Sequence, residues 1–190
     1  NGEIYNYVEL REKLEKLDVS FQSTSDTEVL LEAYRVWGTD CFSRFNGLWA
    51  LALYDFRKRR LILSRDRLGK KPLYWTRSGS RLYFASEIKS LLRVPDVWNS
   101  RKVNEEAVWH WCIDGRRDLD YSTFFAGIHS LPSACWTLVD RNFPNNIQTF
   151  WEVPRERLRE ADISVPEAMR LVRETLEDAV RIRLRADVPL

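Results

Sequence analysis

The sequence contains few of the residues on which metal sites, disulfide frameworks and histidine-dependent catalysis rely. Its 190 residues include only two histidines and three cysteines. Cys41, Cys112 and Cys135 are odd in number and widely spaced, so buried free thiols in a reducing compartment are expected. His110 and Cys112 could form half of a metal site, but no second pair follows, and we predict no metal. Neither His110 nor His129 lies in a motif for a catalytic pair.

The sequence also lacks a long apolar run and an excess of charge of one sign. No apolar stretch approaches the roughly 18 residues that a membrane span requires. Lysine and arginine number 30 against 28 aspartates and glutamates, and this near balance argues neither for nor against acidic partners. The basic run at 57–60 lies between apolar runs and is interpreted as a solvated turn. We therefore expect no membrane and no nucleic-acid partner, and take the cytoplasm as the default location.

An initiator methionine is also absent, and the chain opens with Asn1-Gly2-Glu3. The side-chain amide of Asn1 and the backbone N–H of Gly2 are two donors that could stabilise the negative oxygen of a tetrahedral acyl intermediate. Glu3 and Asp26 are carboxylates that could hold an ammonium group. Together these residues outline a pocket for an amino-acid amide, without a nucleophile. We expect the start of the chain to be a cut, with functional residues upstream of it.

Each of these residues also has a simpler explanation. As a bare dipeptide, Asn-Gly is a common turn signal. Glu3 alone could be a solvated carboxylate. The pattern Ser25-x-x-Glu28 is a capping box, which places Asp26 in the first turn of a helix, where backbone dipoles favour a carboxylate without any ligand.

The order of apolar segments predicts an α+β domain. Leucines at helical spacing indicate a helix over about 7–17, and a second helix follows the capping box and ends at Gly38. Short apolar segments joined by tight turns then indicate antiparallel strands covered on both faces. These strands are expected at 48–54, 61–63, 73–75, 82–85, 134–140 and 148–151, with helices at 86–93 and 104–112.

The last part of the chain is expected to begin a second domain. Residues 154–163 are charged and lose periodicity, which indicates a linker after a first domain at 1–153. The pattern Ser164-x-x-Glu167 is a second capping box at the start of a long helix, and residues 187–190 look like the start of a strand. A second domain is therefore predicted from 164 to 190. The buried face of its helix is predicted at Met169, Val172, Leu176 and Ala179.

Several motifs occur in a fixed order along the whole chain. Examples are Asn-Gly-Glu-Ile-Tyr-Asn at 1–6, Ser-Asp-Thr-Glu at 25–28 and Arg-Asp-Arg-Leu-Gly-Lys-Lys-Pro-Leu-Tyr at 65–74. In this order they resemble the class II glutamine amidotransferase domain of glutamine-dependent asparagine synthetases. Any one motif would be weak, whereas six or more in one order are specific. The others lie at 46–50, 85–89, 127–132, 149–151 and 183–190.

The resemblance implies the N-terminal-nucleophile hydrolase fold, a four-layer α/β/β/α sandwich with antiparallel sheets, followed by the first helix of an α/β ATP-pyrophosphatase domain. It implies that an N-terminal cysteine attacks the side-chain amide of glutamine, with its own α-amine as base. Ammonia then reaches a second domain, where ATP and aspartate react. Asn1 and Gly2 match that family's oxyanion donors, and Glu3 and Asp26 match its acidic residues around the substrate ammonium. ATP and Mg²⁺ are implied for the second domain alone, and a homodimer stays open.

Three parts of the family pattern are absent from these residues: the N-terminal cysteine, an arginine that binds the glutamine carboxylate, and the ATP-pyrophosphatase domain. The polypeptide as written is therefore expected to be inactive. One alternative is a non-catalytic structural domain, as in proteins that resemble β-lactam synthetases. Another is an amidotransferase with a different acceptor, in polysaccharide or peptide modification. The segment 65–74 is interpreted as scaffolding, and Ser86, Glu87 and Lys89 receive no role.

Overall fold

The computed structural model describes residues 1–116, 121–140, 143–144, 146–155, 158–159 and 161–185. The chain separates into two compact units. The first contains Asn1–Glu3 and Gly47–Trp151, and the second contains Ile4–Asn46 and Glu152–Leu190. The predicted start of a strand at 187–190 lies outside the described residues, and the domain boundaries at 153 and 164 stay a prediction.

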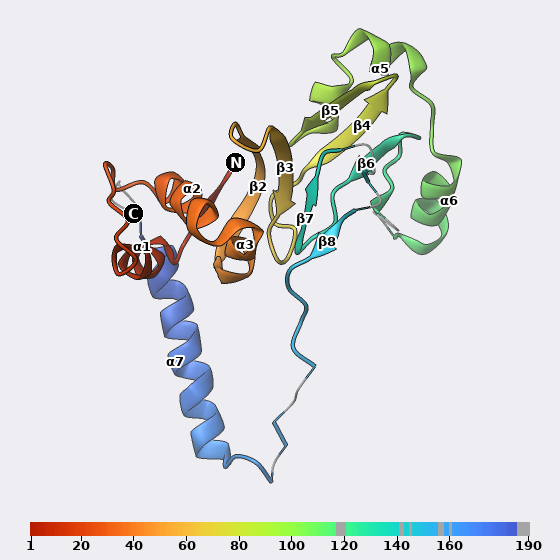
Figure 1. Cartoon of the computed structure of the whole chain (residues 1–190). Coiled ribbons are helices and arrows are strands. Elements are labelled where there is room, and N and C mark those ends of the chain that lie inside the picture. Colours follow the sequence, from red (N-terminus) through yellow and green to blue (C-terminus); the bar gives the residue numbers. More distant parts are fainter. Residues whose placement is uncertain (117–120, 141–142, 145, 156–157, 160, 186–190) are drawn as a thin grey trace. The chain divides into compact units, whose positions relative to one another are not determined.

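The first unit is built on two antiparallel sheets, as the sequence predicts (Figure 1). The larger sheet has the strand order β1-β2-β3-β7-β8, and the smaller has the order β5-β4-β6. Two of these strands, β1 and β6, are too short to give a clear apolar pattern and were not predicted. The strands are β1 (Gly2–Ile4), β2 (Gly47–Asp55), β3 (Arg60–Arg65), β4 (Tyr74–Ser78), β5 (Arg81–Ala85), β6 (Ile128–Ser130), β7 (Cys135–Leu138) and β8 (Gln148–Thr149).

A hydrophobic cluster joins the two sheets of the first unit. Ala50 of β2 and Leu63 of β3 belong to the same cluster as Trp75 of β4. Burial of apolar surface between sheets is the main favourable term in such a sandwich. The remaining buried members of the cluster are Leu73, Leu131 and Phe143.

The strand β3 is covered on both of its faces. Ile62, Leu63 and Ser64 follow one another in this strand, and all three are fully buried. Because successive residues of a strand point to opposite faces, neither face of β3 is open to solvent. This confirms the prediction that the apolar run at 61–63 belongs to a strand covered on both sides.

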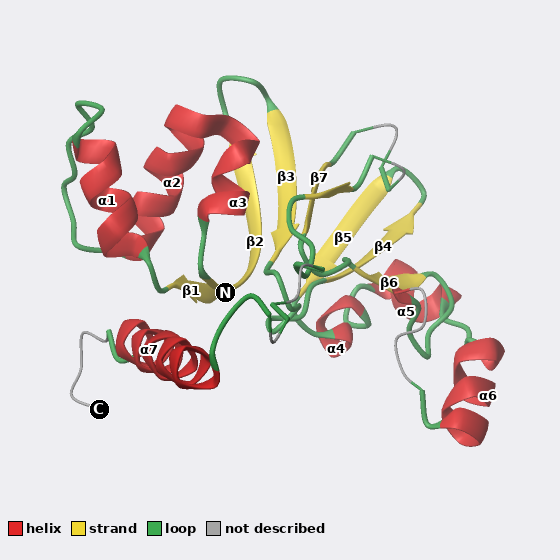
Figure 2. Ribbon diagram, turned by 90° about the horizontal axis from the view of Figure 1, so that it is seen from below, coloured by secondary structure: helices red, strands yellow, loops and turns green. Residues whose placement is uncertain are grey.

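Short helices cover the second face of the smaller sheet (Figure 2). Tyr74 packs against a cluster formed by Leu91, Val97 and Ile128, whereas its neighbour Trp75 belongs to the cluster between the sheets. The two clusters therefore lie on opposite faces of β4. The helix predicted at 86–93 is shorter than expected. The helices of this unit are α4 (Ile88–Leu91), α5 (Pro95–Ser100) and α6 (Glu105–Asp114).

The second unit contains a packed pair of helices, α1 and α2, which lie side by side in Figure 2. Leu10 and Leu14 are buried on α1, and Val29 and Ala33 are buried on α2. The helix predicted over about 7–17 ends earlier, at Glu15, so Leu17 lies past the end of α1 and is exposed. The helices are α1 (Tyr7–Glu15), α2 (Asp26–Trp37), a 3₁₀ turn (Gly38–Asp40) and α3 (Cys41–Arg44).

The capping box at the start of α2 is present in a modified form. The hydroxyl of Ser25 accepts a hydrogen bond from the backbone N–H of Thr27 at 3.1 Å. The carboxylate of Glu28 reaches back past Ser25 and accepts from the backbone N–H groups of Gln22 at 2.8 Å and Ser23 at 2.7 Å. Hydrogen bonds from Ser23 and Gln22 hold the pKa of Glu28 below its usual value. The loop before α2 is thereby tied to the first turn of the helix.

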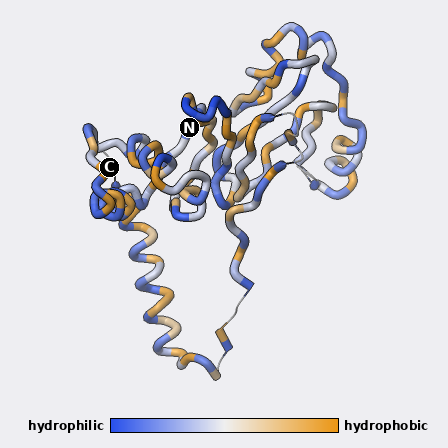
Figure 3. Tube along the Cα trace, viewed as in Figure 1, coloured by the Kyte–Doolittle hydropathy of each residue, from blue (hydrophilic) through white to orange (hydrophobic). Residues whose placement is uncertain are grey.

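The C-terminal helix α7 (Val165–Arg183) begins where the second capping box predicts, but it does not bury the predicted face. The hydroxyl of Ser164 accepts from the backbone N–H of Glu167 at 3.4 Å. Apolar and polar residues alternate along the helix in Figure 3, yet the spacing identifies only an apolar face and not what covers it. No helix in the described part of the chain is long and apolar enough to cross a membrane. The prediction was wrong for Met169, Val172 and Leu176, which are 67%, 64% and 61% exposed.

An ion pair attaches the end of α7 to the start of α1 within the second unit. One guanidinium nitrogen of Arg185 donates to the carboxylate of Glu9 and to the backbone carbonyl of Tyr5, each at 2.7 Å. A second nitrogen donates to the other oxygen of Glu9, and the guanidinium of Arg183 lies 4.9 Å from the Tyr5 ring centre. Hydrogen bonding to Arg185 lowers the pKa of Glu9 from 4.5 to about 2.

This ion pair predicts a pH-dependent contribution to stability. A lowered carboxyl pKa stabilises the folded state fully above the ordinary value of 4.5, and this contribution is lost as the pH falls toward about 2. We expect Glu9→Gln to destabilise the protein by about 1 kcal/mol at pH 7, a value reduced for the solvent screening of the partly exposed carboxylate.

Thermal unfolding at pH 7 and pH 3 tests the ion pair. Glu12→Gln, which neutralises an exposed carboxylate of the same helix, is the matched control. The difference between Glu9→Gln and the parent protein should shrink at pH 3, and a difference independent of pH would contradict the assignment.

Candidate active site

The residue Asn1 is held by the neighbouring strand β2. Its backbone nitrogen donates to the carbonyl of Ala50 at 3.2 Å, and its carbonyl accepts from the N–H of Ala50 at 2.8 Å. Its side-chain amide nitrogen donates to the hydroxyl of Ser86 at 3.3 Å. The backbone of Asn1 is therefore fixed, and its carboxamide has a partner on a segment 85 positions away.

The residue Gly2 occupies a position that only glycine can fill. Its φ angle is +142°, and a β-carbon added there would lie 2.1 Å from the carbonyl oxygen of Leu48 and 2.6 Å from the α-carbon of Trp49. Both obstacles are backbone atoms of β2, which cannot move without disrupting the sheet. Gly2 is thus required by close backbone approach, whatever its backbone N–H does in catalysis.

The two predicted acidic residues occupy different settings. Glu3 is exposed in the middle of β1. Asp26 is the first residue of α2, and its carboxylate accepts from the backbone N–H of Ile4 at 2.9 Å. Asp26 therefore anchors the backbone that directly follows Glu3, a role that the sequence did not reveal. Binding of an ammonium group by Glu3 and Asp26 stays a prediction.

A buried carboxylate, Asp66, orders the turn that follows β3. Its side chain is almost fully buried and accepts four backbone hydrogen bonds. One comes from Trp49 at 3.2 Å, and Trp49 precedes the residue that pairs with Asn1. Several backbone donors can satisfy a buried carboxylate without a cationic partner. The other three donors, each at 3.0 Å, are the N–H groups of Leu68, Lys70 and Lys71.

The guanidinium of Arg65 provides a second brace for the same turn. It donates to the backbone carbonyls of Gly69 at 2.8 Å, Lys71 at 2.8 Å and Leu131 at 2.7 Å. It also donates to the hydroxyl of Ser130 at 2.8 Å. These hydrogen bonds end on backbone and serine oxygens, which supports the interpretation of the segment 65–74 as scaffolding.

Two of the cysteines are buried and not activated, and Nδ1 of His110 lies 3.2 Å from a carboxylate oxygen of Asp114. Burial raises the pKa of the Cys41 thiol to about 12 and also raises that of Cys135, so neither is an activated nucleophile. Burial lowers the pKa of His129, whose ring stacks on Trp75 at 4.7 Å between ring centres. Among the described residues, no group of three or more histidine, cysteine, aspartate or glutamate side chains could hold a metal ion.

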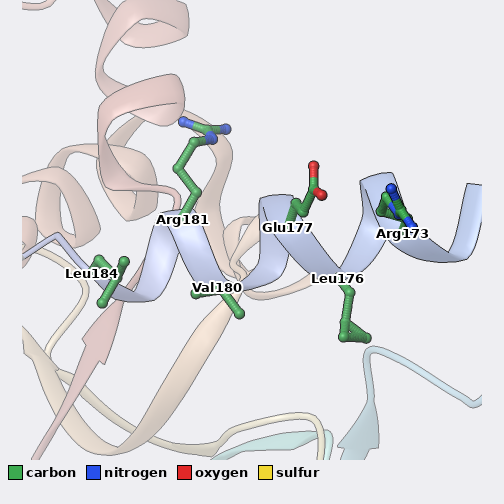
Figure 4. Close-up of a pocket in the computed structure, with 6 residues that line it drawn as sticks. All are labelled: Arg173, Leu176, Glu177, Val180, Arg181 and Leu184. Atoms are coloured by element: carbon green, nitrogen blue, oxygen red, sulfur yellow. The ribbon is translucent and has the colours of Figure 1, made fainter.

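A groove of about 470 Å³ lies along α7. In Figure 4, Leu176, Val180 and Leu184 project from one side of the helix, and Glu177 and Arg181 project from another. Its lining contains no cysteine, serine or threonine and none of the predicted site residues. The groove is a feature of the exposed apolar face of α7 and not of the candidate active site.

Comparison with known protein families gives a match over most of the chain. A family model described as a glutamine amidotransferase domain matches residues 1–151. The chain belongs to this family. The glutamine amidotransferase domain therefore contains both β-sheets and every predicted site residue, whereas α7 lies after the matched range.

Curated relatives extend the similarity over the whole chain. Asparagine synthetase (glutamine-hydrolysing) 3 of Bacillus subtilis is 35% identical over 100% of this chain and 30% of its own length. Asparagine synthetase (glutamine-hydrolysing) 1 of the same organism is 32% identical over 100% of this chain and 29% of its own length. The resemblance seen in the sequence is confirmed. The chain spans about a third of the length of these relatives.

A solved structure confirms the fold class. The glutamine phosphoribosylpyrophosphate amidotransferase of B. subtilis matches with a TM-score of 0.52 over 80% of this chain and 28% of that protein, at 17% identity. At this identity the likeness shows the fold alone. The amidotransferase domain is thus an α+β fold with antiparallel sheets of the N-terminal-nucleophile type, as the sequence predicts.

Proposed function

We propose that this chain is the glutamine-hydrolysing part of an ATP-dependent asparagine synthetase, which supplies ammonia for the amidation of aspartate. The observation that carries the proposal is the placement of Asn1. Its backbone is fixed by Ala50, and its carboxamide is held by Ser86, next to a glycine N–H. Two such donors on a rigid strand are what a tetrahedral acyl intermediate requires. The relatives named asparagine synthetase support the same reaction.

In this proposal the residues of this chain bind glutamine and stabilise the tetrahedral intermediate, and a residue upstream attacks the glutamine side-chain amide. Asn1 and Gly2 donate to the oxygen that becomes negative when the glutamine amide is attacked. Glu3 and Asp26 hold the α-ammonium of glutamine. The nucleophile is a cysteine that bears its own α-amino group, so it precedes Asn1 in the full-length protein. The cysteines at 41, 112 and 135 lie inside the chain and have no free α-amine.

The remaining assignments concern the full-length protein. We propose that residues 164–190 begin the ATP-pyrophosphatase domain, which binds ATP, Mg²⁺ and aspartate. The exposed apolar face of α7 is consistent with further protein against it. We place the enzyme in the cytoplasm, and the free buried thiols Cys41 and Cys135 are consistent with a reducing compartment.

A second candidate function is a domain that kept the fold and lost glutamine hydrolysis. The presence of Gly2 does not distinguish the two, because the backbone of β2 requires glycine there. Nor does Asp26, because it anchors the N–H of Ile4. The distinction depends on Asn1 and Glu3, which are exposed side chains that the fold does not require. Their retention favours the catalytic function.

The proposal is tested on the full-length protein. Release of glutamate from glutamine, and formation of asparagine from aspartate and ATP with glutamine or ammonia, are measured separately. Glutamine-driven and ammonia-driven synthesis of asparagine are both expected. Absence of glutamate release would support the non-catalytic alternative, and synthesis of another amide would identify a different acceptor.

Glu3→Gln is expected to raise the KM for glutamine about tenfold, with a smaller effect on kcat. The substitution removes the charge that attracts the substrate ammonium, and a hydrogen bond between charged groups contributes about 1.5 kcal/mol. Glu12→Gln removes an exposed carboxylate on α1 and serves as the control. An unchanged KM in Glu3→Gln would remove Glu3 from the substrate site.

A further inference from the structure

The sequence motif at 85–89 contains a serine, Ser86, that contacts the candidate active site. Ser86 follows the last residue of β5 and precedes α4 by two positions. Its hydroxyl oxygen accepts a hydrogen bond from the side-chain amide nitrogen of Asn1 at 3.3 Å. This contact crosses from the smaller sheet to the strand segment that contains the predicted oxyanion donors.

The carboxamide of Asn1 must be oriented before it can stabilise an oxyanion. Hydrogen bonds to Ala50 fix the backbone of Asn1 on both sides, so the freedom that remains is rotation of its side chain. The carboxamide carries two N–H donors on one end and an accepting oxygen on the other. Rotation by half a turn would place that oxygen where the negative oxygen develops, and the interaction would become repulsive. A partner for one N–H leaves the second N–H for the substrate.

The residues on both sides of Ser86 are well packed. Ala85 lies opposite Tyr74 in the register of β4 and β5. On the other side of Ser86, Ile88 and Leu91 belong to the cluster that covers the second face of the smaller sheet. The hydroxyl is therefore held from both directions along the chain, and its position relative to Asn1 is set by the packing of the first unit.

We propose that Ser86 is a positioning residue for the oxyanion hole, which holds the Asn1 carboxamide with an N–H directed at the tetrahedral intermediate. The inference rests on the proposed function. In this role Ser86 acts on the oxyanion through Asn1. Because the oxyanion forms only after attack on the amide, Ser86 affects the chemical step and not the binding of glutamine.

The test compares Ser86→Ala with Ser86→Thr in the full-length protein. Ser86→Ala should lower kcat for glutamine hydrolysis about fivefold, the effect of one neutral hydrogen bond, with KM unchanged. Ser86→Thr keeps the hydroxyl and should restore most of the rate. Ammonia-driven synthesis should be unchanged in both variants. Ser90→Ala, which removes an exposed hydroxyl from α4, is the matched control.

A second readout uses the aldehyde analogue of glutamine, which forms a tetrahedral adduct with a thiol and so mimics the intermediate. Its inhibition constant should rise in Ser86→Ala by about the same factor as kcat falls, while that of glutamate stays constant. Equal kcat in Ser86→Ala and the parent protein would overturn the positioning role of Ser86 but not the proposed function. An equal loss of both synthetic activities with a lower melting temperature would assign Ser86 to folding and also overturn the positioning role. A parent protein without glutamine hydrolysis would overturn both the proposed function and the inference.

Discussion

Substitution of Asn1 by alanine is expected to lower glutamine-driven amide synthesis by about a hundred- to a thousandfold in the full-length protein. The change removes a side-chain donor from the developing oxyanion, and loss of one such donor typically has an effect of this size. Ammonia-driven synthesis bypasses glutamine hydrolysis, so it should be largely unchanged. Folding should also be little affected, because the side chain of Asn1 is exposed and its carboxamide contact is a hydrogen bond of 3.3 Å to Ser86.

Two further variants sharpen this experiment. Asn1→Asp keeps the shape of the side chain but replaces the donor with an acceptor, and it should be at least as inactive as Asn1→Ala. Asn99→Ala removes an exposed carboxamide from α5 and should leave both activities intact. An equal fall of glutamine-driven and ammonia-driven synthesis in Asn1→Ala would show that Asn1 does not belong to an oxyanion hole.

Substitution of Gly2 by alanine is expected to have the largest effect on stability, a loss of about 3–5 kcal/mol. The new β-carbon would lie 2.1 Å from the carbonyl oxygen of Leu48, and the φ angle of +142° is strained for any residue with a side chain. Relief requires movement of β2, which is paired with β3 along most of its length. Chemical unfolding of the variant and the parent protein measures the difference.

A control variant separates two costs of Gly2→Ala: the strained backbone conformation and the steric clash of the new β-carbon with β2. Gly79 also has a positive φ angle, +58°, but no atom lies within 4 Å of an added β-carbon. Gly79→Ala should therefore show only the cost of the backbone conformation, about 1 kcal/mol. If Gly2→Ala is no more destabilising than Gly79→Ala, the close approach of Gly2 to β2 is wrong.

Local patterns were sufficient to predict the helices α1, α2, α6 and α7 and the longer strands. The first turn of a helix is determined by neighbouring residues, so the caps at Ser25 and Ser164 could be recognised. The partner of Asn1 could not be recognised, because Ala50 lies 49 positions away and a local pattern does not determine strand register.

The residues that support the site were harder to identify. Asp66 appears in a charged segment, and nothing in its neighbours shows that it is buried and bonded to the N–H of Trp49. The same applies to Asp26, whose bond to Ile4 joins a helix to a strand. The apolar face of α7 shows the opposite error. The helical periodicity identifies this apolar face clearly. It does not show whether other residues of the described chain cover the face, and most of the face is exposed.

The ion pair between Glu9 and Arg185 has a consequence for the order in which contacts form while the protein is synthesised. The two residues are separated by 176 positions. A ribosome adds about 5–20 residues per second, so Glu9 is synthesised about 9–35 s before Arg185 exists. During that interval α1 can pack against α2, but it lacks its ionic partner. Closure of this contact joins the two ends of the described chain, and it is therefore among the last events in the maturation of the second unit.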